Sequence, residues 1–292
     1  MKPAPFTYHD PEHIDDLIAL LSEVDDAKIL AGGQSLLPML NLRFLLPDHV
    51  IDINKIQALQ FIGRQGNDLM IGAMTRQKDL LQSDTVRSAC PVMQVALQYV
   101  GHFQTRNRGT LGGSLCHLDP SAELAAIASL YNAKLTLRGP DGSRNVNFDE
   151  WPLAYMTPNL GPNEVLEKVN LPLWEERHGH AFVEFQRRHG DFAIVAVGCL
   201  LAVDGSGSIT RVALTVAGAN VKPQRLTTTE TALIGQPTNT ATFAAAAAEA
   251  AKLDAMSDAY ISREYRRKLA GALVKRALVA ATASATGVPA YA

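Results

Sequence analysis

The chain has 292 residues, a formal net charge of −2 at pH 7 and 47% hydrophobic residues. A chain of this size and composition can bury a substantial core, and we expect about two domains. It has no basic excess that would favour nucleic acid, and no unbroken apolar run approaches the roughly 18 residues of a membrane span. Residues 1–6 lack the apolar core of a signal peptide, so we expect a cytoplasmic protein. Three dispersed cysteines form no metal or iron–sulfur motif and fit a reducing compartment.

The first half of the chain predicts alternating helices and strands. Asp10, Pro11 and Glu12 form a helix start signal, with Asp10 as the N-cap, and apolar residues at helical spacing extend this helix over 11–23. Asp119 is the expected N-cap of a later helix, over 121–128. The remaining patterns predict strands over 27–30, 50–53, 69–73, 133–137 and 145–148, and helices over 36–40, 75–81 and 91–100.

The second half predicts a sheet followed by helices. A boundary is expected between residues 172 and 180, where an apolar segment gives way to a charged one. Strands are predicted over 181–187, 194–203 and 209–217, with a hairpin turn at 204–207 between the last two, and helices over 229–233, 242–253 and 262–281. The whole pattern indicates an α+β (α/β) protein.

Two glycine-rich turns stand out. The stretch from Arg106 to Pro120 contains three glycines within five residues, with hydroxyls at Thr110 and Ser114, and its backbone N–H groups can turn toward an anion. A second turn, residues 31–35, follows the strand over 27–30. Neither fits the single-loop Rossmann or Walker pattern. Each could be an ordinary turn between strands, but the pair predicts a cradle that holds a long diphosphate ligand from two sides.

Four motifs, in this order, make the sequence similar to the flavin-binding medium subunit of the molybdenum hydroxylases, the family of xanthine dehydrogenase and aerobic carbon monoxide dehydrogenase. They are AGGQS at 31–35, IGA at 71–73, the run 104–114 continuing to DPSAE at 119–123, and RRHGDFA at 187–193. The resemblance covers nearly the whole chain. It implies a PCMH-type FAD-binding domain over 1–176, with subdomains of about 1–55 and 56–176, and a C-terminal domain over 177–287 with a three-stranded antiparallel sheet and a helix bundle.

The resemblance also implies a set of FAD-binding residues. The diphosphate and ribityl chain would lie along Ile29, Leu30, Ala31, Gly32, Gly33, Gln34, Ser35 and Leu36, with Val100, Thr110, Gly113 and Ser114 opposite. Glu123 would lie near a sugar of the cofactor with His117 nearby, and Leu160 would pack on the adenine side. His117 could instead be a turn histidine with satisfied hydrogen bonds, and Leu160 a plain loop hydrophobe.

The last motif would place Arg187 and Asp191 at the isoalloxazine ring. The two adjacent arginines and the aspartate can form an ion pair that holds this loop. The alternative is a solvated turn with Phe192 in the core. Several family members carry a lysine two residues after the aromatic residue of the preceding strand, whereas here Phe182 is followed by Val183 and Glu184.

By this resemblance the chain is an FAD-carrying electron-transfer subunit with no catalytic residue and no metal site of its own. Its partners would be a large molybdopterin subunit and a small iron–sulfur subunit, in a dimer of heterotrimers. Electrons would pass from iron–sulfur clusters through FAD to an external acceptor during hydroxylation of an N-heterocycle, an aldehyde or a similar small substrate. Two alternatives remain: a stand-alone FAD-dependent oxidoreductase of the vanillyl-alcohol oxidase-like fold, and a flavin-free assembly protein.

Overall fold

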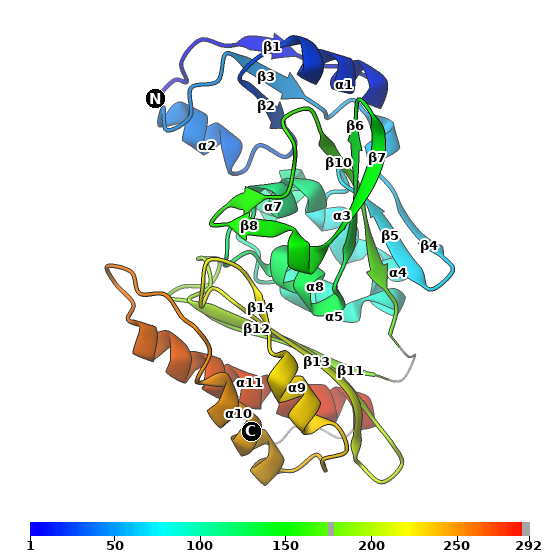
Figure 1. Cartoon of the computed structure of the whole chain (residues 1–292), viewed down its shortest axis with the longest axis vertical. Helices are drawn as coiled ribbons and strands as arrows, with labels where there is room; N and C mark the ends of the chain where they lie inside the picture. Colours follow the sequence, from blue (N-terminus) through cyan, green and yellow to red (C-terminus); the bar gives the residue numbers. More distant parts are fainter. Residues whose placement is uncertain (175–177, 288–292) are drawn as a thin grey trace.

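The computed structural model describes residues 1–174 and 178–287 and stacks three main sheets along the long axis of the molecule (Figure 1). The α+β prediction is confirmed. The predicted domain boundary at residue 176 lies outside the described residues. In the described part of the chain, no helix is long and apolar enough to cross a membrane.

The N-terminal sheet is parallel and has the order β1-β3-β2, from β1 (Thr7–His9), β3 (His49–Asp52) and β2 (Ala27–Leu30). Helix α1 (Ile14–Glu23) covers it, and helix α2 (Leu36–Asn41) follows β2. The predicted N-cap of α1 is wrong: the helix begins after His13. The Asp10 carboxylate instead pairs with the Lys55 ammonium at 2.6 Å, which leaves Pro11 and Glu12 ahead of the helix.

The middle sheet is antiparallel and has the order β4-β5-β10-β6-β7. Its strands are β4 (Ile62–Gln65), β5 (Asp68–Gly72), β10 (Val165–Pro172), β6 (Lys134–Gly139) and β7 (Gly142–Asn147). The central strand β10 was not predicted, because Glu167 and Lys168 interrupt its apolar pattern. A short hairpin, β8 (Pro152–Ala154) and β9 (Thr157–Pro158), lies beside this sheet.

Eight helical segments accompany the middle sheet in the described chain. They are η1 (Gln57–Leu59), α3 (Gln77–Gln82), α4 (Asp84–Ala89), α5 (Pro91–Leu97), α6 (Phe103–Arg108), α7 (Leu111–His117), α8 (Glu123–Tyr131) and η2 (Phe148–Glu150). The expected cap of α8 is wrong. The Asp119 Oδ1 atom accepts from the Ser121 N–H at 2.8 Å and so closes the turn before the helix, which begins at Glu123.

The C-terminal sheet has the three predicted antiparallel strands, β11 (Gly179–Phe185), β12 (Val195–Val203) and β13 (Ile209–Ala217), and a two-residue fourth strand, β14 (Gln224–Arg225). The helices that follow are α9 (Thr227–Leu233), α10 (Thr240–Ala250) and α11 (Arg263–Thr286). Along β12, Val197 and Leu201 join the core with α10 and α11, whereas Ala196 and Leu200 join the core that contains α8. The strand is therefore buried on both faces, and its sequence is a continuous apolar run.

Helix α8 joins the two halves of the molecule. All nine of its residues are buried, and it packs on β12 and β13 as well as on α5, α7 and β10. A Cβ atom on Gly198 would lie 3.0 Å from the Leu130 side chain, so the absence of a side chain there lets the helix approach the sheet.

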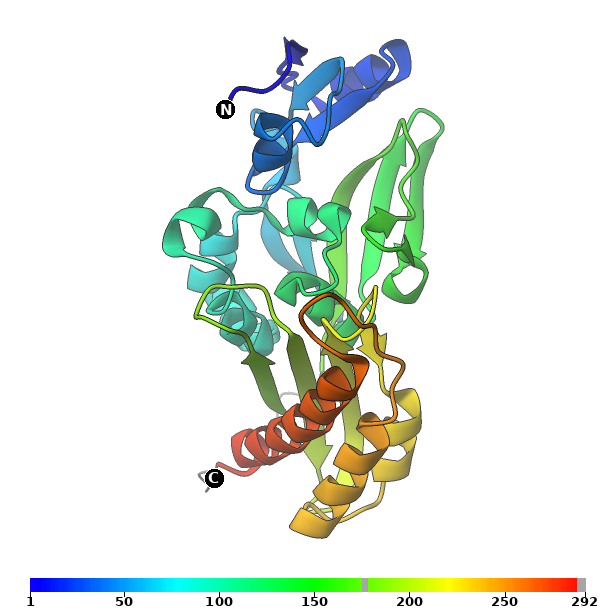
Figure 2. The same cartoon turned by 90° about the vertical axis from the view of Figure 1, so that its left-hand side faces the viewer.

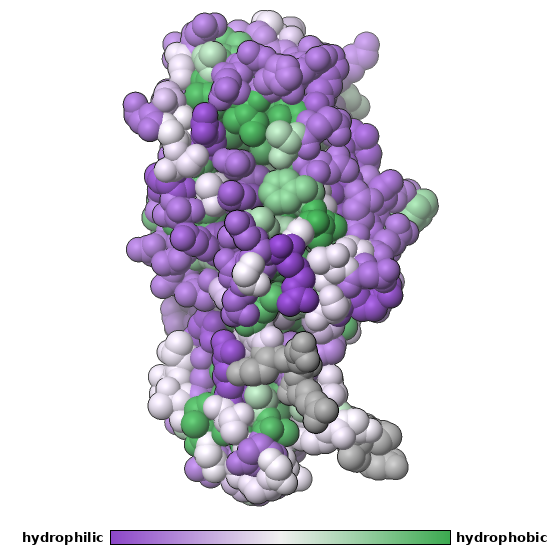
Figure 3. Space-filling view, turned by 90° about the vertical axis from the view of Figure 1, so that its right-hand side faces the viewer, coloured by the Kyte–Doolittle hydropathy of each residue, from purple (hydrophilic) through white to green (hydrophobic). Residues whose placement is uncertain are grey.

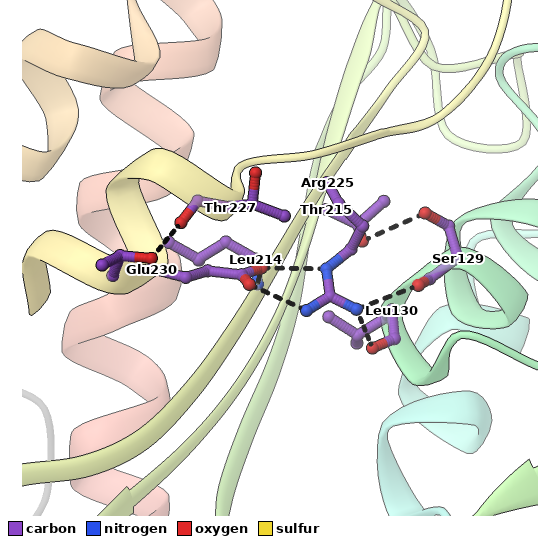
Figure 4. A network of polar contacts seen from close by, with 8 residues as sticks. Ser129, Leu130, Leu214, Thr215, Arg225, Thr227 and Glu230 are labelled. Atoms are coloured by element: carbon purple, nitrogen blue, oxygen red, sulfur yellow. Dashed lines mark hydrogen bonds and ion pairs between the residues drawn. The ribbon is translucent and has the colours of Figure 1, made fainter. Parts of the chain in front are cut away.

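An arginine of the C-terminal sheet holds the C-terminal end of α8 (Figure 4). Arg225 donates to the carbonyl oxygens of Ser129 and Leu130, at 3.3 and 3.0 Å, in the last turn of the helix, where carbonyls lack intrahelical partners; the Ser129 carbonyl also accepts from the Asn132 N–H at 3.0 Å. The same guanidinium forms two parallel hydrogen bonds with the Glu230 carboxylate, at 2.8 and 2.9 Å, and that carboxylate also accepts from the Leu214 N–H.

We expect Arg225→Ala to lower the free energy of unfolding by about 2–4 kcal/mol, because the largely buried Glu230 carboxylate loses its counter-charge and α8 loses its cap. Urea unfolding followed by circular dichroism measures this loss. Arg225→Lys, which keeps the charge but not the paired hydrogen bonds, should fall in between. An alanine variant as stable as the parent would contradict the role given to this network.

Candidate functional site

The first glycine turn, Ala31 to Ser35, connects the end of β2 to α2. Gly33 has φ of 72°, a left-handed conformation that glycine adopts without steric cost. Among the described residues, the backbone N–H groups of Gly32, Gly33, Gln34 and Ser35 donate to no protein acceptor. Four unpaired donors at the carboxyl end of a parallel strand, just before a helix, suit an anionic group.

The second turn is built differently. Its N–H groups are already used inside the protein: Leu111 donates to the Thr75 carbonyl, Gly112 to the Ala73 carbonyl at 2.8 Å, and Gly113 to the Thr110 hydroxyl at 3.0 Å. Thr110 is 1% exposed and caps α7. The expectation that both turns offer backbone donors is therefore wrong for the second turn. Its N–H groups are used to begin α7 and to hold that helix against the end of β5.

The structure nevertheless brings the two turns into direct contact. A Cβ atom on Gly32 would lie 2.4 Å from the Arg108 carbonyl oxygen and 2.9 Å from the Gly109 Cα. A Cβ atom on Gly113 would lie 3.6 Å from that of Ala31. Ser114, which is partly exposed, lies one residue further along α7. The missing side chain of Gly32 thus sets how closely the two turns can approach.

Two residues that the sequence analysis missed tie the turns together. The Asn54 amide donates to the Ala31 carbonyl of the first turn at 2.9 Å. Arg76 donates to the Asn54 side-chain oxygen and to the Arg108 carbonyl beside the second turn. A signal for Asn54 was present, because it follows β3, the neighbour of β2, and ligand-binding residues gather at the carboxyl edge of parallel strands.

A buried carboxyl group on α8 and a partly buried one on β11 influence each other. Glu123 opens α8 and is 9% exposed, and burial raises its pKa to about 7. Burial, together with the charge of Glu123, raises the pKa of Glu184 to about 8. The Glu184 Oε2 atom is buried and has no hydrogen-bond partner among the described residues. Burial and the neighbouring Glu123 carboxyl group thus favour the protonated form of Glu184.

The loop from Arg187 to Asp191 sits on the start of α6. A Cβ atom on Gly190 would lie 3.2 Å from the Gly101 carbonyl oxygen, next to the predicted site residue Val100. Among the ion pairs of the described residues there is none between Arg187 or Arg188 and Asp191, so the predicted ion pair is not formed there. The Arg187 guanidinium instead lies over the Tyr260 ring, 5.3 Å from its centroid, where the ring face attracts a cation. Phe192 is 70% exposed, so it does not enter the core.

The other predicted residues lie around both turns. Ile29 and Leu30 end β2, Gln34 donates to the Gly32 carbonyl at 3.0 Å, and Leu36 opens α2. His117 ends α7 and is half-buried, which lowers its pKa, and Leu160 follows β9, which packs on α7. Within the described ranges, no hydrogen bond joins the Arg187 to Asp191 loop to the first turn, and no group of residues could hold a metal ion.

Comparisons with known proteins identify the family of this chain. The family described as "FAD binding domain in molybdopterin dehydrogenase" matches residues 4–174, and "CO dehydrogenase flavoprotein C-terminal domain" matches residues 180–281. The chain is 38% identical to the carbon monoxide dehydrogenase medium chain of Hydrogenophaga pseudoflava, covering 97% of this chain and 99% of that one. It is 35% identical to the 6-hydroxypseudooxynicotine dehydrogenase complex subunit alpha of Paenarthrobacter nicotinovorans, covering 96% of each.

Solved structures show the same likeness. Carbon monoxide dehydrogenase from Hydrogenophaga pseudoflava matches with a TM-score of 0.93 and 35% identity, over 97% of this chain and 99% of that one. Quinoline 2-oxidoreductase from Pseudomonas putida 86 matches with a TM-score of 0.94 and 31% identity, over 98% and 99%.

We expect Gly32→Ala to weaken FAD binding by about tenfold or more, roughly 1.4 kcal/mol, because the added methyl group must push the two turns apart. Gly63→Ala is the matched control, since a Cβ atom on Gly63 would meet nothing within 4 Å. Fluorescence titration of the flavin-free variants with FAD measures both affinities. Equal affinities would show that the contact between the turns does not shape the site.

The pKa of Glu123 predicts a pH dependence of stability. Because burial raises this pKa to about 7, the folded chain binds the proton more tightly than the unfolded chain. The resulting stabilisation is complete below the ordinary carboxyl pKa and disappears as the pH rises through about 7; it amounts to about 3 kcal/mol at most. Urea unfolding of the flavin-free chain at pH 5 and pH 8 should show a smaller difference for Glu123→Gln than for the parent. An unchanged difference would mean that Glu123 ionises normally.

Proposed function

Because the chain belongs to the FAD-binding medium subunits of the molybdenum hydroxylase family, we propose that it carries FAD between the two glycine turns and passes electrons from iron–sulfur clusters to an external acceptor. The observation that carries this proposal is the contact of Gly32 with Arg108 and Gly109, which sets four unpaired N–H groups beside the second turn. We place the end of the FAD-binding domain at residue 176.

The residues present fit the diphosphate of FAD. The unpaired N–H groups of Gly32 to Ser35 can donate to its oxygens, and the Ser114 hydroxyl has no partner among the described residues. Asn54 and Arg76 would keep the two turns at a fixed separation while the cofactor binds. This chain's contribution is therefore to hold the cofactor and to keep water and other ligands from its place.

We assign the other predicted residues around the same ligand. Glu123 would accept a hydrogen bond from a sugar hydroxyl of the cofactor. Such a bond favours the ionised carboxylate, so FAD binding would lower the pKa that burial raises in the FAD-free chain. Leu160 would pack on the adenine side, with His117 nearby. Arg187, held over Tyr260, and Asp191 would border the flavin ring. FAD itself can accept two electrons and release them singly or in pairs, which suits a link between one-electron carriers and an acceptor.

The names of the relatives point to assembly, since they describe a medium chain and a subunit of a dehydrogenase complex. We propose a large molybdopterin subunit and a small iron–sulfur subunit as partners, in a dimer of heterotrimers in the cytoplasm. The hydroxylated substrate, an N-heterocycle, an aldehyde or a similar small molecule, would bind to the large subunit. The match of residues 180–281 to the flavoprotein C-terminal domain favours this over a stand-alone oxidoreductase.

Purification of the tagged chain from its native host tests the proposal. We expect a yellow protein with one FAD per chain that copurifies with molybdenum, iron and two further subunits. Addition of the substrate without an acceptor should then bleach the flavin absorbance near 450 nm. A colourless chain would favour the flavin-free assembly protein, and a yellow chain that reacts with substrate without any partner would favour the stand-alone enzyme.

A further inference from the structure

The start of helix α11 carries a buried arginine that belongs to neither glycine turn. Arg266 is 5% exposed, although arginine side chains are almost never fully buried unless they are paired. Its Nη1 atom donates to the carbonyl oxygens of Ile194 and Gly218, at 2.7 and 2.6 Å. Its Nη2 atom donates to the Asp258 carboxylate, which gives the buried charge a counter-charge. One side chain of the C-terminal helix thus binds three separate segments.

The first segment is the loop of residues 186–194 between β11 and β12, which we call the Arg187 loop. The Ile194 N–H donates to the carbonyl of the last β11 residue at 2.9 Å, which closes the base of this loop. The guanidinium binds the carbonyl of the same residue. The Ser121 hydroxyl donates to the neighbouring Ala193 carbonyl at 2.8 Å. The end of the loop is therefore fixed both to α11 and to the turn before α8.

The second segment is the turn that follows β13. Its Gly218 has φ of 75°, and its N–H group donates to the Pro120 carbonyl at 2.8 Å while its own carbonyl accepts from Arg266. A Cβ atom on Gly218 would lie 2.9 Å from the Ile194 carbonyl oxygen, so the two carbonyls that the guanidinium binds are held close together. Pro120 stands three residues before Glu123. Arg266 therefore also supports the turn that leads to this predicted cofactor residue.

The third segment is the loop before α11. The Asp258 Oδ1 atom accepts from the N–H groups of Tyr260 and Ile261, at 2.8 and 2.9 Å, and its Oδ2 atom accepts from Arg266. Tyr260 is exposed, and its ring lies beneath the Arg187 guanidinium. The carboxylate thus joins the buried arginine to the ring on which the second arginine rests.

The segments that Arg266 holds reach one face of the molecule. Figure 2 shows the Arg187 loop and the loop before α11 on the face that also carries α6 and α7. An exposed aromatic residue belongs to α6 and to each of the two loops: Phe103, Phe192 and Tyr260. The opposite face, in Figure 3, is mainly hydrophilic. The arginine therefore acts on the face that includes α7, the helix of the second glycine turn.

Resting on the proposed function, we propose that Arg266 is a positioning residue of the cofactor site. It holds the base of the Arg187 loop, the ring of Tyr260 and the turn that leads to Glu123. Among the hydrogen bonds of the described chain, it makes none to a residue assigned to the cofactor, so it acts through these segments. The C-terminal helix thereby completes a site whose glycine turns lie in the first half of the chain.

A guanidinium suits this task because of its shape. Its N–H donors point in fixed directions within one plane, so acceptors from three segments are held at set positions relative to one another. A lysine ammonium at the same place keeps the charge but concentrates its donors at one atom, so it cannot reach all three acceptors in the same way. Arg266→Lys is therefore the conservative variant, and it should retain only part of the effect.

Trypsin tests the link between Arg266 and the loop, because the exposed Arg187 and Arg188 are themselves cleavage sites. We expect Arg266→Met to raise the cleavage rate at these two residues in the flavin-free chain by about tenfold or more, since the loop base opens more often. Arg276→Met, at an exposed arginine of the same helix, is the matched control and should be cleaved like the parent. Tyr260→Leu, a surface change that leaves the buried ion pair in place, should give a smaller increase.

The link to the cofactor is measured in the same variants. Fluorescence titration of the flavin-free chains should show FAD affinity reduced by about tenfold or more in Arg266→Met, because the turn before Glu123 and the Arg187 loop both move. A redox titration of the FAD-loaded chains should show a more negative flavin potential in Tyr260→Leu, because the positive charge of Arg187 is no longer held in place. Arg266→Lys should fall between Arg266→Met and the parent in cleavage and in affinity.

The outcomes separate this inference from the proposed function. Cleavage at the parent rate in Arg266→Met and Tyr260→Leu would overturn the positioning role and leave the proposed function intact; if Arg266→Met does not fold, Tyr260→Leu and Arg266→Lys decide. Faster cleavage with unchanged FAD affinity and flavin potential would place the Arg187 loop outside the cofactor site, and the inference would fail. A parent chain that binds no FAD would overturn the proposed function, and the positioning role with it, whatever the cleavage rates show.

Discussion

The structure depends on the burial of α8 between two sheets. This helix is buried along its whole length, and Arg225 binds its C-terminal end. It packs closely on the C-terminal sheet because Gly198 has no side chain. Its other end carries Glu123, one of the predicted cofactor residues. The packing that joins the two halves of the molecule therefore also positions Glu123. Loss of the Arg225 contacts would therefore also shift Glu123 at the other end of the helix, because a closely packed interior transmits strain.

A second constraint acts on the glycine turns, where the missing side chain of Gly32 decides how closely two distant parts of the chain can lie. Among the residues that the structure describes, the N–H groups of Gly32 to Ser35 in the first turn have no acceptor, whereas the second turn uses its own to fix α7 on the end of β5. The first turn can thus donate hydrogen bonds to an anion, while the second turn forms a fixed surface beside it. Asn54 and Arg76 then hold the two together, so that the site is largely formed before any ligand arrives.

The polar environment beyond the turns includes a carboxyl group on the strand before the double arginine. This group is Glu184, whose pKa is raised to about 8 by burial and by Glu123. A protonated carboxyl group can donate a hydrogen bond without bringing a negative charge into the site. In the orientation that satisfies both ends of the Gln186 amide, its nitrogen donates to Glu184 and to the Asp191 carbonyl, so this carboxyl group also supports the loop of Arg187.

The sequence by itself determined much of this protein. The period of the apolar residues gave the strand Ala27–Leu30 and the long C-terminal strands, because local patterning and turn residues fix such elements. The two glycine turns were recognisable as partners from their composition. Only the tertiary structure decided what depends on distant residues: strand β10 at the centre of its sheet despite its charges, Asp10 paired with Lys55 instead of capping α1, and Arg187 placed over Tyr260 instead of beside Asp191. The sequence contains several possible partners for each of these side chains. Which of them is bound depends on which one the tertiary structure brings within contact distance.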